Sequence, residues 1–205
     1  MATRPHLAVD TLRLILASGS PRRRELLDVM GLVHAVCPAD VVEWEAVDAN
    51  PRDLVAHNAS LKAEAVSRLH PEALILAADT TVALGDVVLN KPADLEDARA
   101  MLRRLSGCSH TVFTGVSLRC AAQGGVVDFV EQSAVRFRDF DDATITAYFE
   151  RVNPLDKAGA YGIQEGRELI IEGWEGCLHN IMGLPTGRLR DVFEQRGWWP
   201  VLEKR

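Results

Sequence analysis

The sequence predicts an α/β fold: a mixed β-sheet with flanking helices. In the first half of the chain, short apolar runs of strand length alternate with amphipathic helical segments, which favours parallel strands. In the second half, two long strand-like segments meet at Gly124–Gly125, which indicates an antiparallel hairpin. Because βα units and a hairpin occur in one chain, the sheet should contain both kinds of pairing.

The composition is that of an ordinary globular protein. Of the 205 residues, 47% are hydrophobic and 25% are charged, which is enough apolar mass for a substantial core. No apolar run approaches the roughly 18 residues of a membrane span, and the first residues lack the apolar stretch of a signal peptide. We therefore expect a cytoplasmic protein without a membrane partner. The net charge of −6 argues against nucleic acid as a partner, but allows one local cationic pocket.

The cysteines predict neither disulfides nor a metal site. They are scattered along the chain, with no CxxC pair and no metal-ligand spacing, so we interpret them as reduced thiols in or near the core: Cys37, Cys108, Cys120 and Cys177.

The stretch LILASGSPRRRELL indicates a strand, a tight turn and a helix start within residues 14–27. The apolar run at 14–17 is typical of a buried strand, and Gly19 breaks it. Ser20 is a favourable helix N-cap, and Pro21 suits the first helical position. A helix start carries unpaired N–H groups and partial positive charge, so it forms a natural anion site.

Three arginines follow this turn, and helical spacing separates them. The expected buried side of the helix comprises Leu26, Leu27, Val29 and Met30. Arg22 and Arg23 then face the sheet, whereas Arg24 points outward. Two guanidinium groups at the mouth of the turn suit phosphate, because each can donate a bidentate pair of hydrogen bonds. The alternative is a solvated basic first turn, which fits Arg24 best.

The remaining elements follow in order. We expect a strand at 33–41, a helix at 51–69, strands at 72–84 and 87–92 around a Gly85–Asp86 turn, a helix at 93–107, strands at 110–122 and 126–140, a helix at 141–152, a loop-rich stretch at 153–183 and a last helix at 185–196. The acidic cluster at 139–142 fits a turn and a helix N-cap at Asp141 or Asp142 better than a metal site.

Two polar positions break the apolar pattern. Asn58 and Lys62 fall on the apolar side of the helix at 51–69, so Lys62 either snorkels to the edge or faces a polar pocket. Asp79 stands at the carboxyl end of the most apolar strand, where ligands gather in open α/β sheets. It is a candidate metal ligand or general base, and the alternative is a simple strand-end turn. Lys91 and Lys157 add cations in loops, where most lysines are merely solvated.

Several common catalytic motifs are absent from the sequence. It contains no P-loop, no GxGxxG after the first strand and no GxSxG nucleophile elbow.

Taken together, the segments from about Leu14 to Gly197 resemble the Maf-like nucleotide pyrophosphatases, the septum formation family. The matching motifs, in family order, are ASGSPRRRELL, NASLKAEA, AADTTVAL, LNKP, LSGCSHTVFTGV, PLDKAGAYGIQ and MGLP. The resemblance implies hydrolysis of a nucleoside triphosphate between its α and β phosphates, with a divalent cation, Mg²⁺ or Mn²⁺. It also implies two lobes around a deep nucleotide cleft, and it admits a homodimer. Residues 12–205 would form a single domain of this family, and residues 1–11 a disordered tail.

The resemblance assigns roles residue by residue. Asp79 matches the catalytic carboxylate that accepts a proton from the attacking water, and it would also bind the metal. Glu45 would share the metal, with Glu43 as a competitor for that role. The remaining groups would bind substrate phosphates: Ser18, Ser20, Arg22, Arg23, Lys62 and Lys91.

Three positions match the branch of the family that prefers dTTP and UTP: Arg22, Thr80 and Gln164. A Gln amide offers a donor and an acceptor to a pyrimidine edge. Glu165 departs from the glycine-richer loop of this branch and brings negative charge near the base. Two alternatives stay open: a pyrophosphatase for modified nucleotides such as 7-methyl-GTP, and a cell-division regulatory protein that binds nucleotides with little turnover.

Overall fold

The computed structural model describes residues 11–121 and 124–205. The tail expected at residues 1–11 therefore lies outside the described residues, apart from the exposed Thr11.

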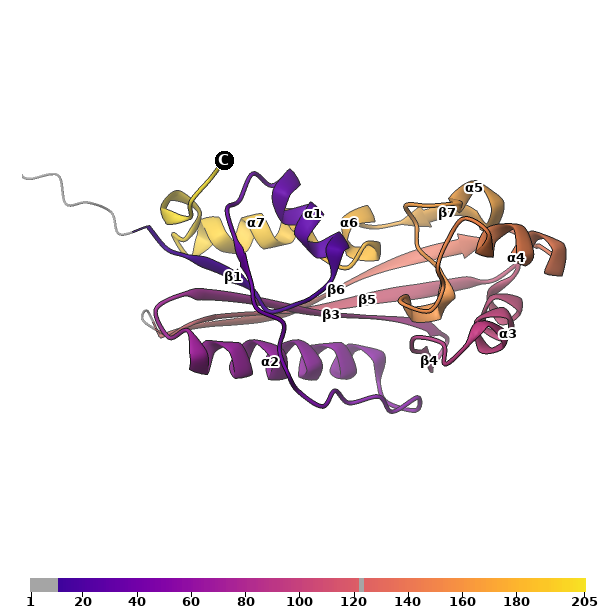
Figure 1. Cartoon of the computed structure of the whole chain (residues 1–205), viewed down its shortest axis with the longest axis horizontal. Coiled ribbons are helices and arrows are strands. Elements are labelled where there is room, and N and C mark those ends of the chain that lie inside the picture. The colour runs from indigo at the N-terminus through magenta and orange to yellow at the C-terminus, as the bar shows by residue number, and fades with distance from the viewer. Residues whose placement is uncertain (1–10, 122–123) are drawn as a thin grey trace, which may run out of the picture.

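A seven-stranded mixed sheet forms the centre of the molecule, in the order β2-β1-β3-β5-β6-β7 with β4 beside β3 (Figure 1). The strands are β1 (Leu14–Leu16), β2 (Ala35–Val36), β3 (Leu74–Leu84), β4 (Val87–Leu89), β5 (Ser109–Cys120), β6 (Gly125–Phe137) and β7 (Ile171–Glu175). Strand β1 pairs in parallel with β2 and β3, and the other pairs are antiparallel. The predicted mixed sheet and its β5–β6 hairpin are confirmed.

Helices cover both faces of the sheet. They are α1 (Pro21–Val29), α2 (Pro51–Leu69), α3 (Leu95–Leu105), α4 (Asp142–Phe149), α5 (Arg167–Ile170), α6 (Leu178–Ile181) and α7 (Thr186–Gln195), with short 3₁₀ turns at Ala158–Ala160 and Trp199–Val201. Helix α2 lies along one face, whereas α1 and α7 lie on the other, and α3, α4 and α5 gather at one end (Figure 1). Within the described ranges, no helix combines the length and hydrophobicity that crossing a bilayer requires.

The hydrophobic core follows this arrangement. On one face, Leu26 and Leu27 of α1 and Phe193 of α7 belong to a cluster with the leucines of β1 and β3. On the opposite face, Ala63 and Val66 of α2 pack on the sheet. A further cluster joins α3, α4 and the ends of β5 and β6, and contains buried aromatic side chains.

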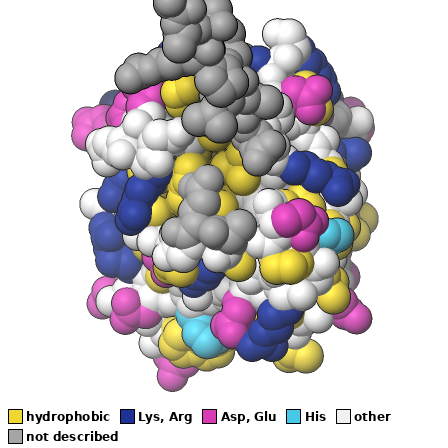
Figure 2. Space-filling view, turned by 90° about the vertical axis from the view of Figure 1, so that its left-hand side faces the viewer, with side chains coloured by type: hydrophobic (Ala, Val, Ile, Leu, Met, Phe, Trp, Pro, Cys, Tyr) yellow, Lys and Arg dark blue, Asp and Glu magenta, His cyan; other side chains and the backbone are white. Residues whose placement is uncertain are grey.

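At the end of the molecule shown in Figure 2, basic and acidic side chains are interspersed.

Local expectations need three corrections. Val29 is 75% exposed, because it lies two residues, about 200° of helical rotation, beyond the buried Leu27. The strand expected at 33–41 shortens to the two residues of β2, beside a segment without regular structure. The stretch expected to be loop-rich contains α5, β7 and α6, of which β7 pairs with the edge of β6.

Asp79 does not end its strand, as the sequence predicted, but lies in the middle of β3. The strand continues because Thr80, Thr81 and Val82 favour extended backbone, and β5 pairs with it from Leu74 to Ala83. On the other edge, β1 pairs with β3 only as far as Leu76. Strand β4 pairs with β3 from Val82 onward. Asp79 therefore lies where this edge of β3 is open between two partner strands.

The main chain of helix α2 comes very close to the sheet at Gly115. This glycine pairs with Asp79 across the β3–β5 ladder. A Cβ atom placed on it would overlap the Val55 carbonyl oxygen and lie 2.9 Å from the Ala56 nitrogen. The main chains of α2 and β5 are thus in direct contact, and only glycine fits at this position.

Gly115→Ala should lower the free energy of unfolding by about 1–3 kcal/mol, the usual cost of overpacking a core. Gly187→Ala is the matched control, because a Cβ there meets nothing within 4 Å. Since Gly187 lies in α7, that change should raise the stability by about 0.5–1 kcal/mol. Denaturant unfolding of both variants measures the difference in stability. Equal stabilities would show that α2 and β5 can move apart at Gly115 without loss of stability.

Candidate active site

A cavity of about 500 Å³ opens beside the middle of β3. Its walls come from the turn before α1, the irregular segment around Trp44, helix α2, the 156–164 loop and the turn after α6. Every site residue selected from the sequence lines it: Ser18, Ser20, Arg22, Arg23, Glu43, Glu45, Lys62, Asp79, Thr80, Lys91, Lys157 and Gln164. Arg24 is exposed and not part of this lining, as the helical spacing predicted.

Lys62 joins two carboxylates at the floor of the pocket. Its Nζ donates to Asp79 Oδ1 at 2.8 Å and to Glu43 Oε2 at 2.5 Å. The residue is only 9% exposed, and its ammonium group points to these partners rather than to the molecular edge. Snorkelling is therefore the wrong alternative for Lys62, which faces a polar pocket.

Asn58 holds the second oxygen of the same carboxylate. Its Nδ2 donates to Asp79 Oδ2 at 3.1 Å and to the Trp44 carbonyl oxygen at 3.0 Å. Its Oδ1 accepts a hydrogen bond from the Trp44 main-chain N–H at 2.9 Å. Asn58 had no role in the sequence-based prediction, although its place on the apolar side of the helix was a signal.

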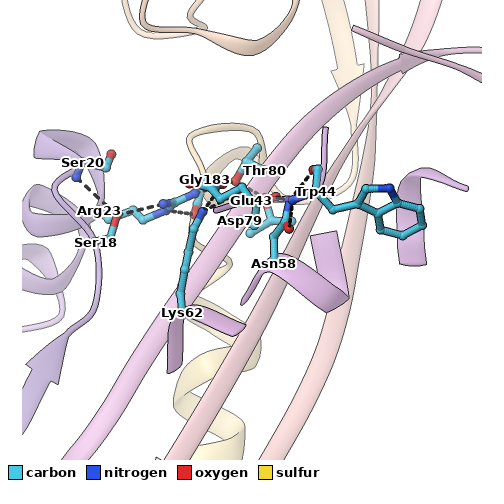
Figure 3. A network of polar contacts seen from close by, with 11 residues as sticks. Ser18, Ser20, Arg23, Glu43, Trp44, Asn58, Lys62, Asp79, Thr80 and Gly183 are labelled. Atoms are coloured by element: carbon cyan, nitrogen blue, oxygen red, sulfur yellow. Dashed lines mark hydrogen bonds and ion pairs between the residues drawn. The ribbon is translucent and has the colours of Figure 1, made fainter. Parts of the chain in front are cut away.

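Arg23 reaches from α1 to the far wall of the pocket (Figure 3). Its guanidinium donates to Gly183 O at 2.9 Å, to Ser18 Oγ at 2.9 Å and to Thr80 Oγ1 at 3.1 Å. Burial lowers the pKa of this guanidinium from its usual value, and the charge of Asp79 opposes that shift. These three hydrogen bonds all go to neutral oxygens, so none of them pairs the guanidinium with a carboxylate.

Thr80 is held on both sides. Besides the Arg23 contact, its hydroxyl lies 3.0 Å from Thr114 Oγ1, and Thr114 donates in turn to Asn180 O at 3.0 Å. Thr80 thus fixes the guanidinium relative to the sheet.

Ser20 caps α1 by position, with Pro21 as the first helical residue, but its hydroxyl makes no capping hydrogen bond.

The basic side chains that line the pocket include Arg22 and Lys157, which lie beside Asp156, and the exposed Lys91. Arg22 lies 3.3 Å from Asp156 Oδ2, and Lys157 Nζ lies 2.7 Å from Asp156 Oδ1. Lys157 is 9% exposed, so it is more enclosed than a solvated loop lysine. Lys91 and Gln164 are exposed where they line the pocket.

A buried neutral pair supports the wall beside Gln164. Tyr161 lines the pocket, and its hydroxyl lies 2.7 Å from His110 Nε2. Burial raises the pKa of Tyr161 well above its usual value and lowers that of His110 to about 4, so both groups are uncharged at neutral pH. This pair was not among the residues that the sequence selected.

The carboxylates of the pocket suit a hard divalent cation. Mg²⁺ is usually held by one or two carboxylates together with substrate phosphates, and Asp79, Glu43 and Glu45 supply such oxygens. Among the residues that the structure describes, no cluster of three or more His, Cys, Asp or Glu forms a metal cage. Glu43 is joined to Asp79 through Lys62, whereas the main-chain oxygen of Glu45 accepts from Asn90 Nδ2 at 3.1 Å.

Comparisons with known proteins support the family resemblance that the sequence motifs indicated. The chain is 40% identical to a dTTP/UTP pyrophosphatase of Thermotoga maritima, over 95% of this chain and 94% of the relative. It is 45% identical to a dTTP/UTP pyrophosphatase of Anaeromyxobacter dehalogenans strain 2CP-C, over 91% of this chain and 95% of the relative. A relative of the same name from Akkermansia muciniphila is 42% identical, over 88% and 93%. Residues 13–196 match the family model described as Maf-like protein, and the chain therefore belongs to the Maf-like family.

Proposed function

We propose that this protein hydrolyses dTTP and UTP to the nucleoside monophosphate and pyrophosphate. The observation that supports this most directly is the Asp79 carboxylate, set among Lys62, Arg23 and Arg22 in one pocket. A cationic pocket attracts a polyphosphate, and a fixed carboxylate in it can activate water. The names of the relatives support the same reaction and the same substrates.

The triphosphate would bind along the cationic wall. The three hydrogen-bond acceptors of Arg23 are neutral, so its charge stays available to phosphate, and Lys91 is exposed on the pocket. Arg22 can exchange Asp156 for phosphate at little cost, because a half-exposed ion pair contributes at most about 1 kcal/mol. These groups would stabilise the negative charge that develops on the leaving pyrophosphate.

Asp79 would act as the proton acceptor. The water oxygen attacks the α-phosphorus, the bond from that phosphorus to the oxygen bridging to the β-phosphorus breaks, and the water proton passes to Asp79. Lys62 and Asn58 each donate to one oxygen of this carboxylate, so its orientation is fixed before the substrate arrives. Such preorganisation avoids the cost of aligning the base during the reaction.

The divalent cation would be Mg²⁺ or Mn²⁺, held by Asp79 and by Glu45 or Glu43. When bound, it supplies charge neutralisation at the phosphates and lowers the pKa of a coordinated water.

Base preference would depend on Arg22, Thr80 and Gln164. Thr80 acts through Arg23, since its hydroxyl accepts a hydrogen bond from that guanidinium. Gln164 is exposed on the pocket, where its amide can pair with a pyrimidine edge. We further propose that residues 12–205 form a single domain with two lobes around the pocket, because its lining takes Ala17 from one hydrophobic cluster and Val82 and Tyr161 from another.

Asp79→Asn should lower kcat for pyrophosphate release by about 10²-fold or more, since a positioned base or metal ligand is lost. Nucleotide binding should be largely retained, because Asn has the same shape and the cations remain. Asp86→Asn, in the exposed β3–β4 turn, is the control and should keep full activity. A folded Asp79→Asn enzyme with more than roughly a tenth of the wild-type rate would contradict this role.

The neighbouring arginines should differ sharply. Arg23→Ala should reduce kcat/KM for dTTP by about 10-fold to 100-fold, the worth of a charge-assisted contact. Arg24→Ala should leave kcat/KM nearly unchanged, since its side chain is exposed and not part of the pocket lining. Thermal unfolding of both variants separates lost packing from lost chemistry, and a larger kinetic effect at Arg24 would refute the helical-facing argument.

Gln164→Glu should lower kcat/KM for dTTP and UTP with little effect on folding, because the amide donor becomes a negative acceptor. A buried polar mismatch costs about 1–3 kcal/mol, so base discrimination can be steep. The assay compares dTTP, UTP, CTP, GTP and 7-methyl-GTP with one metal. If GTP or 7-methyl-GTP exceeded both pyrimidines in the wild type, the base assignment would fail, although pyrophosphatase activity would stand.

A further inference from the structure

We infer that Asn58 is a positioning residue of this site, which holds the Asp79 carboxylate and the Glu43–Glu45 segment in one fixed arrangement. The inference rests on the proposed function, because it assigns a role in that reaction. It also makes a claim about the order of the segment, which can be measured without turnover.

The burial of Asn58 requires an explanation. The residue is 2% exposed and lies among alanines and valines on the inner side of α2. A buried amide is unfavourable unless it is fully hydrogen-bonded, and an apolar residue would satisfy packing alone. Its hydrogen bonds therefore indicate what the amide does.

Those hydrogen bonds use the donor capacity of the amide completely. One Nδ2 hydrogen goes to Asp79 Oδ2 and the other to the Trp44 carbonyl oxygen, at 3.1 and 3.0 Å. The Oδ1 accepts from the Trp44 N–H at 2.9 Å. If the amide oxygen and nitrogen were exchanged, the amide oxygen would face Asp79 Oδ2 and the Trp44 carbonyl oxygen, which are themselves acceptors. The orientation of the group is therefore fixed.

The segment that Asn58 holds has no regular secondary structure of its own. Residues 37–46 form neither helix nor strand, and Trp44 is 42% exposed. Asn58 binds both the N–H and the carbonyl of Trp44. These hydrogen bonds take the place of the main-chain hydrogen bonds that a neighbouring strand would make to this residue. Glu43 and Glu45, the two acidic candidates, flank that anchored residue in sequence and line the pocket.

Lys62 completes the arrangement one helical turn away. Positions four apart share a helix face, so Asn58 and Lys62 present their polar groups side by side. Asn58 binds Asp79 Oδ2 and the main chain of Trp44, whereas Lys62 binds Asp79 Oδ1 and the side chain of Glu43. Figure 3 shows these groups converging. Two residues of α2 thus fix the base and the acidic segment relative to each other.

Since its donors are occupied by the protein, Asn58 should affect turnover more than binding. Asn58→Leu keeps the number and branching of the side-chain heavy atoms and suits the apolar helix face, so the protein should fold. Its kcat for pyrophosphate release from dTTP with Mg²⁺ should fall by about tenfold or more, with KM within about threefold of the wild type. Asn58→Asp keeps the acceptor for Trp44 N–H but loses both donors and faces Asp79 with a carboxylate, so its kcat should fall at least as far.

The control is Ser60→Ala, which lies two residues along the same helix. Ser60 Oγ accepts from Arg119 Nη2 at 2.7 Å, so its removal costs α2 a hydrogen bond to β5 without touching Asp79 or the segment. That variant should keep the wild-type kcat. If it lost activity as Asn58→Leu does, general loosening of α2 would explain both effects and the inference would be overturned.

Hydrogen–deuterium exchange supplies the readout that is independent of activity. In Asn58→Leu, the Trp44 amide should exchange about fivefold faster or more, as expected for its one lost hydrogen bond. Unchanged exchange there, or wild-type kcat in either folded variant, would overturn the inference. If Asn58→Leu failed to fold, the kcat of Asn58→Asp decides, because that variant keeps the acceptor for the Trp44 N–H. A wild type that releases no pyrophosphate would refute the proposed function, whereas the exchange result would still test the positioning of the segment.

Discussion

The close contact between α2 and β5 at Gly115 is the constraint on which the site depends. Because Gly115 has no side chain, the helix main chain lies directly on the strand that pairs with β3 at Asp79. The side chains of Asn58 and Lys62 then reach both oxygens of that carboxylate. A larger residue would push the helix outward and separate these groups, so the chemistry of the pocket depends on a packing detail of the sheet.

The charges of the pocket are balanced unequally, which gives each cation a different task. Lys62 is neutralised by two carboxylates and therefore organises the protein more than it attracts substrate. Arg23 is solvated by three neutral oxygens, which satisfy its hydrogen bonds without cancelling its charge. An acidic chain of net charge −6 can thus present a local positive centre to a polyphosphate.

Local signals in the sequence predicted much of this structure, because they depend on residues close together in the chain. The Pro51 start of α2, the Ser20–Pro21 start of α1 and the hairpin at Gly124–Gly125 are of this kind. The mid-strand place of Asp79 was missed, because it depends on the pairing of β5 with β3 as far as Ala83 and of β4 with β3 from Val82 onward. Strand β7 is stabilised by the edge of β6 rather than by its own pattern. The roles implied by the family motifs fell on residues that share one pocket. Asn58 begins the motif NASLKAEA but received no role, because its significance lies in contacts to Trp44 and Asp79 from other parts of the chain.

The hydrogen bond from Arg23 to the Gly183 carbonyl joins positions 160 residues apart. The N-terminal strand region also meets the end of the chain, where Leu12 pairs with Leu202. Because the N-terminal part is synthesised first, Arg23 can bind the Gly183 carbonyl only after the chain has been made as far as residue 183. A chain that stops before Gly183 therefore lacks part of the pocket lining. Formation of the pocket thus depends on synthesis of the chain as far as Gly183.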